Sequence, residues 1–193
     1  MDLTVAAGET VAVVGPSGSG KTTLVSVLGG LLRPTEGELC LDGRAVRVGE
    51  LPPGTVAWVF QTVNLLSHRS AAANVALGML AGGAGRREAH AAALPALEAV
   101  GLSEHAFRRA GTLSGGEAQR VGIARALVGV PRYVLADEPT GQLDLATSRA
   151  VVATLFDARP PSTALVVATH DLELARRCDR ILRVVEGRVV PAR

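Results

Sequence analysis

The sequence predicts an α/β protein with a mostly parallel sheet, a small antiparallel β portion and a helical insert. Two observations predict this class. Short apolar runs alternate with helical stretches, which is typical of a parallel sheet covered by helices. Four of these runs also end at residues able to bind phosphate or metal, and ligands of open parallel sheets bind outside the carboxyl ends of the strands. The four runs are Thr10–Val14, Val56–Phe60, Tyr133–Ala136 and Ala164–Ala168.

The first part of the chain predicts a strand, a loop, a helix and a hairpin. The strand Thr10–Val14 leads into a glycine-rich loop, and an apolar stretch, Thr23–Leu32, predicts the helix that follows. The segment Glu38–Val46 carries Asp42-Gly43 at its centre, a dipeptide that favours a hairpin turn. The strand Val56–Phe60 comes next and leads into Gln61.

The middle of the chain predicts helices and the last part returns to strands. Residues 62–128 are rich in alanine and arginine, and we expect them to form a helical insert in which Pro95 breaks or kinks one helix. The strand Tyr133–Ala136 leads into two acids, and Ala164–Ala168 leads into Thr169 and His170. The segment Ile181–Val190 predicts an antiparallel hairpin that turns at Glu186-Gly187.

The composition predicts one domain of 193 residues, long enough to bury a core of alanine, valine and leucine. The net charge of +2 balances 20 bases against 18 acids, which argues against a nucleic-acid partner. Cys40 and Cys178 have no metal-like spacing, and we interpret them as reduced thiols. The uncharged run from Ser70 to Gly85 is too short to span a membrane, and the N-terminus does not resemble a signal peptide.

The loop after the first strand matches the phosphate-binding pattern G-x-x-x-x-G-K-[ST]. Its glycines let backbone N–H groups approach phosphate, and the following helix directs its positive dipole end at the same point. Lys21 is the chain's single lysine beside 19 arginines, and its slim ammonium suits a loop closed around phosphate better than a guanidinium. The alternative is a glycine-rich turn without a ligand. The match predicts a P-loop NTPase core whose ATP-binding residues are Gly15, Pro16, Ser17, Gly18, Ser19, Gly20, Lys21, Thr22 and Thr23.

Asp137 and Glu138 follow a buried strand, where one carboxylate suits Mg²⁺ and the second suits the attacking water of phosphoryl transfer. The alternative for this pair is a helix cap or a solvated acidic pair. The stretch from Leu113 to Arg120, LSGGEAQR, contains a capping box of Ser114 and Glu117 that opens a helix over Ala118–Val128. A capping box leaves Gly115 and Gly116 unexplained, since glycine is costly in a first helical turn. We therefore expect a second molecule to approach this turn, which predicts a head-to-tail dimer.

With these motifs the sequence resembles the ATP-binding subunit of an ABC transporter over nearly its whole length. Gly15–Thr22 resembles the Walker A loop, and Gln61 resembles the glutamine of the Q-loop. The stretch LSGGE, from Leu113, resembles the family signature. Val134–Asp137 resembles Walker B, followed by Glu138 as the catalytic glutamate; Gln142–Asp144 resembles the D-loop and His170 the switch histidine. The segments from Val59 to Leu66 and from Glu138 to Asp144 are most similar to the lipoprotein-releasing, macrolide-exporting and FtsE-like subgroup.

The resemblance implies a role for each of these residues. Two ATP molecules with Mg²⁺ lie between two subunits of a homodimer or pseudo-symmetric dimer. The implied catalytic residues are Glu138, His170 and Lys21. The implied Mg²⁺ ligands are Thr22, Gln61 and Asp137, with Gln61 also coupled to the membrane partner. The residues implied to act on the nucleotide of the other subunit are Ser114, Gly115, Gly116 and Asp144.

The resemblance further implies a single ABC ATPase domain over residues 1–193. Its catalytic core comprises residues 1–61 and 129–193, and its helical subdomain comprises residues 62–128. The protein is then expected at the cytoplasmic face of the cell membrane, bound to membrane-spanning permease subunits. Alternatives are an ABC ATPase that regulates a complex without transport, as in cell division, a DNA-repair relative, and a nucleotide-binding module without turnover.

The chain departs from the family pattern at two places. Family members usually begin with an extra strand and an aromatic residue that stacks on adenine, whereas no aromatic precedes Trp58 here. This predicts either that Met1 is not the natural start or that adenine binding is weakened. The segment from Ala71 to Asn74 also lacks the acid that the subgroup tends to place there.

Overall fold

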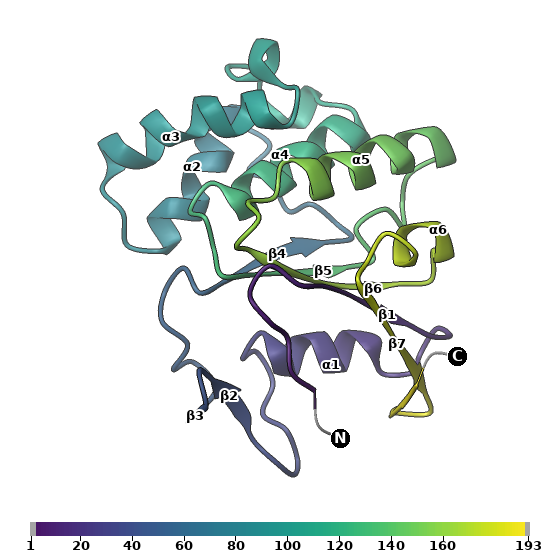
Figure 1. Ribbon diagram of the computed structural model, residues 1–193. Coiled ribbons are helices and arrows are strands. Elements are labelled where there is room, and N and C mark those ends of the chain that lie inside the picture. Colours follow the sequence, from purple (N-terminus) through teal and green to yellow (C-terminus); the bar gives the residue numbers. More distant parts are fainter. Residues whose placement is uncertain (1–2, 192–193) are drawn as a thin grey trace.

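The computed structural model describes residues 3–191 and shows a six-stranded sheet with helices on both faces (Figure 1). The strand order is β4-β5-β6-β1-β7-β8, and all neighbours are parallel except the antiparallel pair β7–β8. This arrangement confirms the predicted α/β fold class. The strands are β1 (Thr10–Val14), β4 (Val56–Phe60), β5 (Tyr133–Asp137), β6 (Ala164–Thr169), β7 (Arg180–Val185) and β8 (Arg188–Pro191).

The register of the parallel strands brings their carboxyl ends to one edge of the sheet. Phe60 pairs with Asp137, Asp137 pairs with Ala168, and Val14 pairs with Thr169. The residues that follow these strands therefore leave the sheet close to one another, as the sequence predicts.

Alternate residues of the central strands pack into two separate layers, as the pleat of a sheet requires. On one face Val11, Val13 and Leu135 pack with Val25 of helix α1 (Lys21–Leu28). On the opposite face Ala12 and the other alternate residues pack under the remaining helices. Figure 1 shows this division, with α1 below the sheet and most of the other helices above it.

The helices above the sheet come from both the middle and the end of the chain. They are α2 (Ala71–Ala81), α3 (Arg86–Ala99), α4 (Gly115–Leu127), α5 (Leu145–Asp157) and the short α6 (Leu172–Ala175), with 3₁₀ turns at Ser103–His105 and Ala110–Thr112. Of the two effects predicted for Pro95, a break or a kink, the break is wrong, because α3 continues through this residue. Among residues 3–191 no helix combines the length and the apolar character needed to cross a bilayer.

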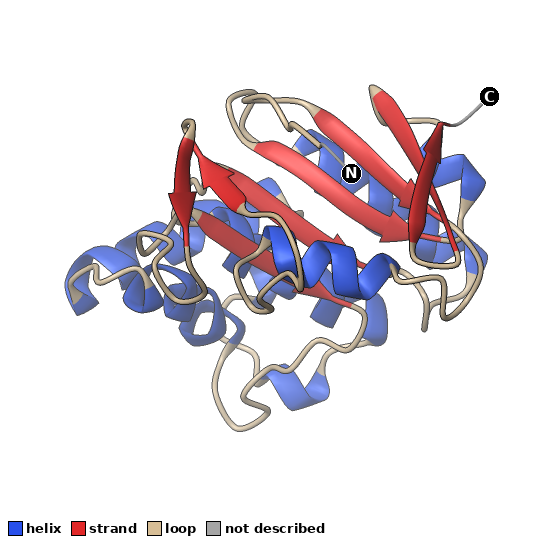
Figure 2. Cartoon of the chain, turned by 90° about the horizontal axis from the view of Figure 1, so that it is seen from below, coloured by secondary structure: helices blue, strands red, loops and turns tan. Residues whose placement is uncertain are grey.

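Both predicted hairpins form with left-handed residues at their turns. Asp42 (φ 52°) and Gly43 (φ 74°) join β2 (Leu39–Leu41) to β3 (Arg44–Val46), and Glu186-Gly187 joins β7 to β8. The strands β2 and β3 form a separate two-stranded sheet, which stands apart from the main one in Figure 2. The second hairpin is not purely antiparallel, because β7 also extends the main sheet parallel to β1.

Two helices have boundaries that differ from the sequence prediction. Helix α1 begins at Lys21 rather than Thr23 and ends at Leu28 rather than Leu32. It ends there because Gly29 caps it and Gly30 turns the chain into the left-handed region (φ 67°). Helix α4 begins at Gly115 rather than Ala118, because the capping serine, Ser114, lies directly before it.

Candidate active site

The phosphate loop connects β1 to α1 at the carboxyl edge of the sheet. Gly20 has φ 104° and caps α1 in a left-handed conformation that a glycine adopts without strain. Pro16, Ser17 and Gly18 are exposed, whereas the Ser19 side chain is buried. The loop therefore presents its backbone at the start of a helix, where an anion is favoured.

Lys21 folds back over this loop. Its ammonium donates hydrogen bonds to the carbonyls of Gly15 (2.9 Å) and Pro16 (3.1 Å), and its side chain is 9% exposed. A planar guanidinium is wider than an ammonium, so we expect an arginine to be accommodated less well between these two carbonyls. The single lysine of the chain thus occupies a position where the shape of its charged group matters.

Glu138 lies directly after β5 and holds a backbone conformation that side chains rarely adopt, with φ 46°. The hydrogen bond from its N–H to the carbonyl of Ala168 (2.9 Å) fixes this turn against β6. Its Oε1 lies 3.7 Å from Nζ of Lys21, and its Oε2 lies 2.8 Å from Nδ1 of His170. The backbone of this residue thus directs one carboxylate at both Lys21 and His170, which come from two other strand ends.

The three predicted catalytic residues are therefore brought together. Lys21 follows β1, Glu138 follows β5 and His170 follows β6, and each reaches the same point from its own strand end. The imidazole of His170 is 72% exposed, so this cluster opens to solvent on one side. An ammonium, a carboxylate and an imidazole beside a phosphate loop are the groups that hydrolysis of a phosphoanhydride needs.

Two buried oxygen atoms near this cluster lack a protein partner. Oδ1 of Asp137 and Oγ of Ser19 are both buried, and neither makes a hydrogen bond within the described residues. Buried polar atoms normally have partners, so unpaired oxygens at a site like this suggest a missing ligand. The hydroxyls of Thr22 and Thr23 stand at the start of α1, where both residues are exposed.

Gln61 is exposed and follows the edge strand β4. Its side-chain amide lies so close to the Cα of Gly141 that a Cβ on that glycine would stand 2.7 Å from Nε2. The neighbouring residues are also joined, because Nε2 of Gln142 donates to Oγ1 of Thr62 (3.4 Å). The predicted Q-loop and D-loop segments therefore lie against each other.

The signature segment forms the predicted capping box. Oγ of Ser114 accepts from the N–H of Glu117 (3.3 Å), and Oε2 of Glu117 accepts from the N–H of Ser114 (2.8 Å). The backbone hydrogen bond from Ser114 holds the pKa of the Glu117 carboxyl below its usual value. Ser114 and Gly115 remain exposed at the helix start.

Gly116 has a reason other than the approach of a second molecule, because packing within the chain also requires a glycine there. A Cβ at Gly116 would overlap with Cγ2 of Thr147 on α5, and one at Gly115 would lie 3.3 Å from Cδ2 of Leu143. The glycines therefore let α4 approach α5 closely, whatever else the turn contacts. Within residues 3–191 no hydrogen bond or ion pair joins this turn to Lys21, Glu138 or His170.

Asp144 caps helix α5 in this structure. Its carboxylate accepts from the N–H groups of Ala146 and Thr147 and from the Thr147 hydroxyl (2.6 Å). The side-chain hydrogen bond from Thr147, followed by the backbone bonds, lowers the pKa of the Asp144 carboxyl. Its position is thereby fixed at the surface, next to the signature helix.

Two further residues, not predicted from the sequence, hold the signature helix in place. His105 places Nε2 3.3 Å from Oε1 of Glu117, so it contacts the capping box directly. Gln119 is 2% exposed and donates from Nε2 to the carbonyl of Phe60 (3.1 Å). A signal for Gln119 exists in the sequence, because it is a polar residue on the same helix face as the buried Gly116 and Ile123.

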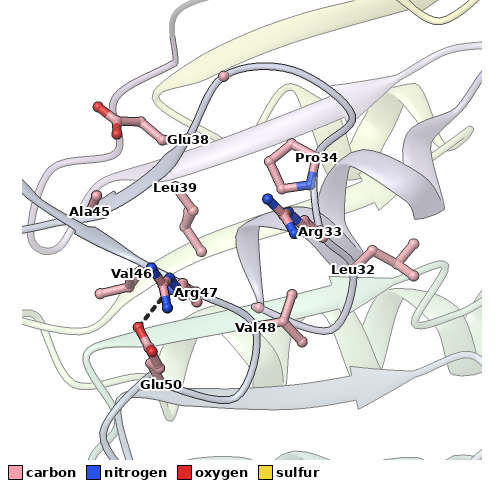
Figure 3. A pocket seen from close by; sticks show the side chains of 12 residues that line it. Leu32, Arg33, Pro34, Glu38, Leu39, Ala45, Val46, Arg47, Val48 and Glu50 are labelled. Atoms are coloured by element: carbon pink, nitrogen blue, oxygen red, sulfur yellow. Dashed lines mark hydrogen bonds between the residues drawn. The ribbon is translucent and has the colours of Figure 1, made fainter.

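Two pockets lie elsewhere in the molecule. A pocket of about 830 Å³ lies beside the β2–β3 hairpin, with Leu32, Arg33, Arg47 and Glu50 among its lining residues (Figure 3). A second space of about 590 Å³, which we call the Trp58 groove, lies along the edge strand β4; it is lined by residues that include Leu31, Leu51, Trp58, Phe60, Leu77 and Arg125. Neither is lined by the phosphate loop, whose open surface instead faces solvent.

The comparison with known families decides the classification. The family model described as "ABC transporter" matches residues 1–141. The chain belongs to the ABC transporter family. The family is one of ATPases, and the match confirms the family that the motifs predict.

Relatives of this ABC protein agree with the predicted subgroup. The chain is 46% identical over 197 residues to the lipoprotein-releasing system ATP-binding protein LolD of Chromohalobacter salexigens, covering 98% of this chain and 83% of that one. It is 40% identical over 195 residues to the macrolide export ATP-binding/permease protein MacB 2 of Aeromonas hydrophila, covering 98% of this chain and 30% of that protein. A solved dimeric, post-hydrolysis structure of the ATP-binding cassette MJ0796, bound to ADP and Pi, superposes with a TM-score of 0.80 at 34% identity, over 99% of this chain and 88% of that one.

Proposed function

We propose that this ABC subunit binds Mg-ATP between two head-to-tail copies and hydrolyses it to drive a membrane-spanning permease. The observation that carries the proposal is the convergence of Lys21, Glu138 and His170 beside the phosphate loop. Each comes from a different strand, and folding alone does not require a lysine, a glutamate and an exposed histidine to meet. Hydrolysis of a phosphoanhydride does require a cation, a base and a γ-phosphate contact at one point.

The cis residues then have these roles. The backbone N–H groups of residues 15–23 bind the phosphate oxygens, and Lys21 leaves the Gly15 and Pro16 carbonyls to meet the β- and γ-phosphates. Glu138 orients the water and accepts its proton as the water oxygen attacks the γ-phosphorus and the bond to the bridging oxygen breaks. His170, already hydrogen-bonded to that carboxylate, contacts the γ-phosphate.

The residues present fit a bound Mg²⁺. The buried, unpaired Oδ1 of Asp137 supports this, because carboxylate oxygen is a ligand that Mg²⁺ prefers. Within residues 3–191 no group of three or more His, Cys, Asp or Glu side chains could hold a metal alone. Mg²⁺ is commonly held by one or two carboxylates together with phosphate oxygens and water, so Asp137 would hold it with ATP, alongside the side-chain oxygens of Thr22 and Gln61. When bound, the ion neutralises charge that develops on the phosphates.

The second subunit would contribute the signature turn. Ser114 and Gly115 are exposed at the start of a 13-residue helix whose capping box leaves further N–H groups open to a phosphate. Ser114, Gly115, Gly116 and Asp144 would act on the nucleotide of the partner copy in a homodimer or pseudo-symmetric dimer. A second solved structure of the similar cassette MJ0796, which is also dimeric, has a TM-score of 0.83 and supports this arrangement.

The membrane partner would bind at the Trp58 groove. Trp58 and Phe60 stack on one face of the edge strand β4, with ring centroids 5.2 Å apart, and Gln61 follows directly. An apolar groove beside a proposed Mg²⁺ ligand suits a partner whose binding must affect the nucleotide site. LolD is named for a lipoprotein-releasing system, and MacB 2 is named as a macrolide export ATP-binding/permease protein, which supports a permease partner at the cytoplasmic face of a membrane. In this arrangement residues 62–128 act as a helical subdomain on a core of residues 1–61 and 129–193.

The solution mass of the Glu138→Gln variant, with and without Mg-ATP, tests this function. The amide keeps nearly the shape of the carboxylate but cannot accept a proton, so ATP stays bound and the dimer persists. We expect the mass of Glu138→Gln to double on addition of Mg-ATP. The double variant Lys21→Ala/Glu138→Gln should remain a monomer under the same conditions. A monomer at saturating ATP would contradict the head-to-tail dimer.

A further inference from the structure

One face of the signature helix α4 is fastened to the segment that carries Gln61, residues 60–64. Three residues at intervals of three make the contacts, namely Gln119, Gly122 and Arg125. Residues spaced in this way lie along one side of a helix. Each contacts a different point of the same short segment, so the segment lies along the helix rather than touching it once.

Gln119 makes the first contact, at the end of strand β4. Its Nε2 donates to the carbonyl of Phe60 (3.1 Å), the residue directly before Gln61. The side chain is 2% exposed, so water cannot readily replace this bond. Loss of this donor would remove the side-chain hydrogen bond that ties the end of β4 to α4.

Gly122 makes the second contact by the absence of a side chain. A Cβ at this position would stand 2.8 Å from Cγ1 of Val63, closer than carbon atoms approach. Val63 therefore rests directly on the helix backbone, and the segment has no freedom to slide toward α4.

Arg125 makes the third contact and also faces the Trp58 groove. Its Nη1 donates to the carbonyl of Asn64 (2.9 Å), and burial lowers its pKa. Among the groove's lining residues in the described chain, it is the one with a charged side chain. Placing a guanidinium in an apolar groove costs free energy unless the charge is hydrogen-bonded. Within residues 3–191 the Arg125 side chain makes one hydrogen bond, and it goes to residue 64.

A third segment, residues 141–147, contacts both residues 60–64 and helix α4. Residues 141–142 contact Gln61 and Thr62, while residues 143 and 147 pack against Gly115 and Gly116 at the start of α4. A shift of residues 60–64 would therefore move α4 both through its contacts at 119–125 and through the D-loop segment. The signature turn and Gln61 are connected by packed contacts rather than by flexible chain.

We propose that Gln119 and Arg125 are positioning residues that fix the signature turn relative to Gln61. Through them the position of Gln61, and the occupancy of the Trp58 groove at Arg125, sets where Ser114 is presented to the partner copy. This inference rests on the proposed dimer. It assigns the coupling to two side chains on one helix face and predicts that they act as a unit with Gln61.

The test measures ATP-induced dimerisation of the full chain in the Glu138→Gln background. Gln119→Leu keeps the volume but removes the donor, and Arg125→Met keeps the alkyl stem but removes the charge. We expect each to weaken the dimer about tenfold, the effect of one buried hydrogen bond, while ATP binding by the monomer changes less than about twofold. Arg125→Lys restores part of the loss. Arg87→Met, on the exposed side of α3, serves as the matched control and leaves dimerisation unchanged.

A double-mutant cycle with Gln61→Ala separates coupling from a merely structural role. Residues that act as one unit have non-additive effects, so Gln119→Leu should cost little more once Gln61 is lost. Additive effects, or a loss of monomer ATP binding in step with dimerisation, would overturn the proposal. Arg125→Met gives the same test independently should Gln119→Leu fold poorly. If the Glu138→Gln parent itself stays monomeric, the proposed function fails first and this inference fails with it.

Discussion

Oε2 of Glu138 lies 2.8 Å from Nδ1 of His170, and the same carboxylate reaches Lys21 with its other oxygen at 3.7 Å. A carboxylate only accepts hydrogen bonds, so Nδ1 carries the proton and Nε2 is left to face the solvent-exposed side. The lysine and the histidine are therefore both held by the group that is proposed to act on water.

Substitution of Lys21 should impair ATP binding, whereas substitution of Glu138 should impair ATP turnover. Lys21→Ala removes the phosphate contact, so we expect ATP affinity to fall by at least about tenfold. Glu138→Gln removes the base and loosens the hold on Lys21, so turnover should fall at least about a hundredfold while ATP binds as well or better. Equilibrium binding and phosphate release, measured on the same samples, check both. Turnover by Glu138→Gln comparable to the wild type would contradict the assigned role.

The choice of lysine over arginine at position 21 gives a sharper test. Lys21→Arg keeps the charge but widens the head group in a space bounded by the carbonyls of Gly15 and Pro16. We expect Lys21→Arg to lose at least about tenfold in ATP affinity, close to the loss for Lys21→Ala. Binding by Lys21→Arg at the wild-type level would show that charge alone is sufficient, and that the single lysine has no steric reason.

Local chemistry made much of this fold predictable. The dipeptide Asp42-Gly43 carries its own turn preference, and the apolar run Thr10–Val14 needs burial on both sides, so both appear where expected. The meeting of Lys21, Glu138 and His170 was also predictable, because parallel strands end at one edge.

The features that the sequence did not predict depend on contacts between residues that are far apart in the chain. Gly116 depends on Thr147, and Gln119 depends on the carbonyl of Phe60, which is 59 residues away. No local pattern shows such partners. Pro95 stays within α3 because tertiary packing of the helix outweighs the cost of one lost hydrogen bond.

Gly116 offers a test in which the sign of the effect changes with the background. Gly116→Ala places a methyl group against Cγ2 of Thr147, and overpacking of this kind costs about 1–3 kcal/mol. Thr147→Ser removes that Cγ2 but keeps the hydroxyl bonded to Asp144. In the serine background the same alanine should raise stability, by up to about 1 kcal/mol, through helix propensity. Urea unfolding of the wild type and these three variants measures both effects.

ATP turnover of the wild type and the same three variants shows whether Gly116 serves packing alone or also acts across the dimer. If a phosphate of the other copy approaches Gly116, the double variant Gly116→Ala/Thr147→Ser should be stable yet still slow, because the methyl group remains in the way. Full recovery of turnover together with stability would show that Gly116 serves packing alone, and would remove it from the trans site.

Asp179 predicts how stability depends on pH. Its Oδ2 accepts from the hydroxyl (2.7 Å) and the N–H (2.8 Å) of Thr10, and the hydroxyl bond, followed by the N–H bond, lowers its pKa. A carboxyl whose pKa is lower when folded contributes stability above its unfolded pKa of about 4, and loses it as the pH falls through the folded value. Urea unfolding between pH 7 and pH 3 should therefore show a loss on the acid side that is smaller in Asp179→Asn, whose amide does not titrate. Thr10→Ser keeps the hydroxyl and should keep the wild-type slope, so an equally flat curve for both variants would contradict this assignment.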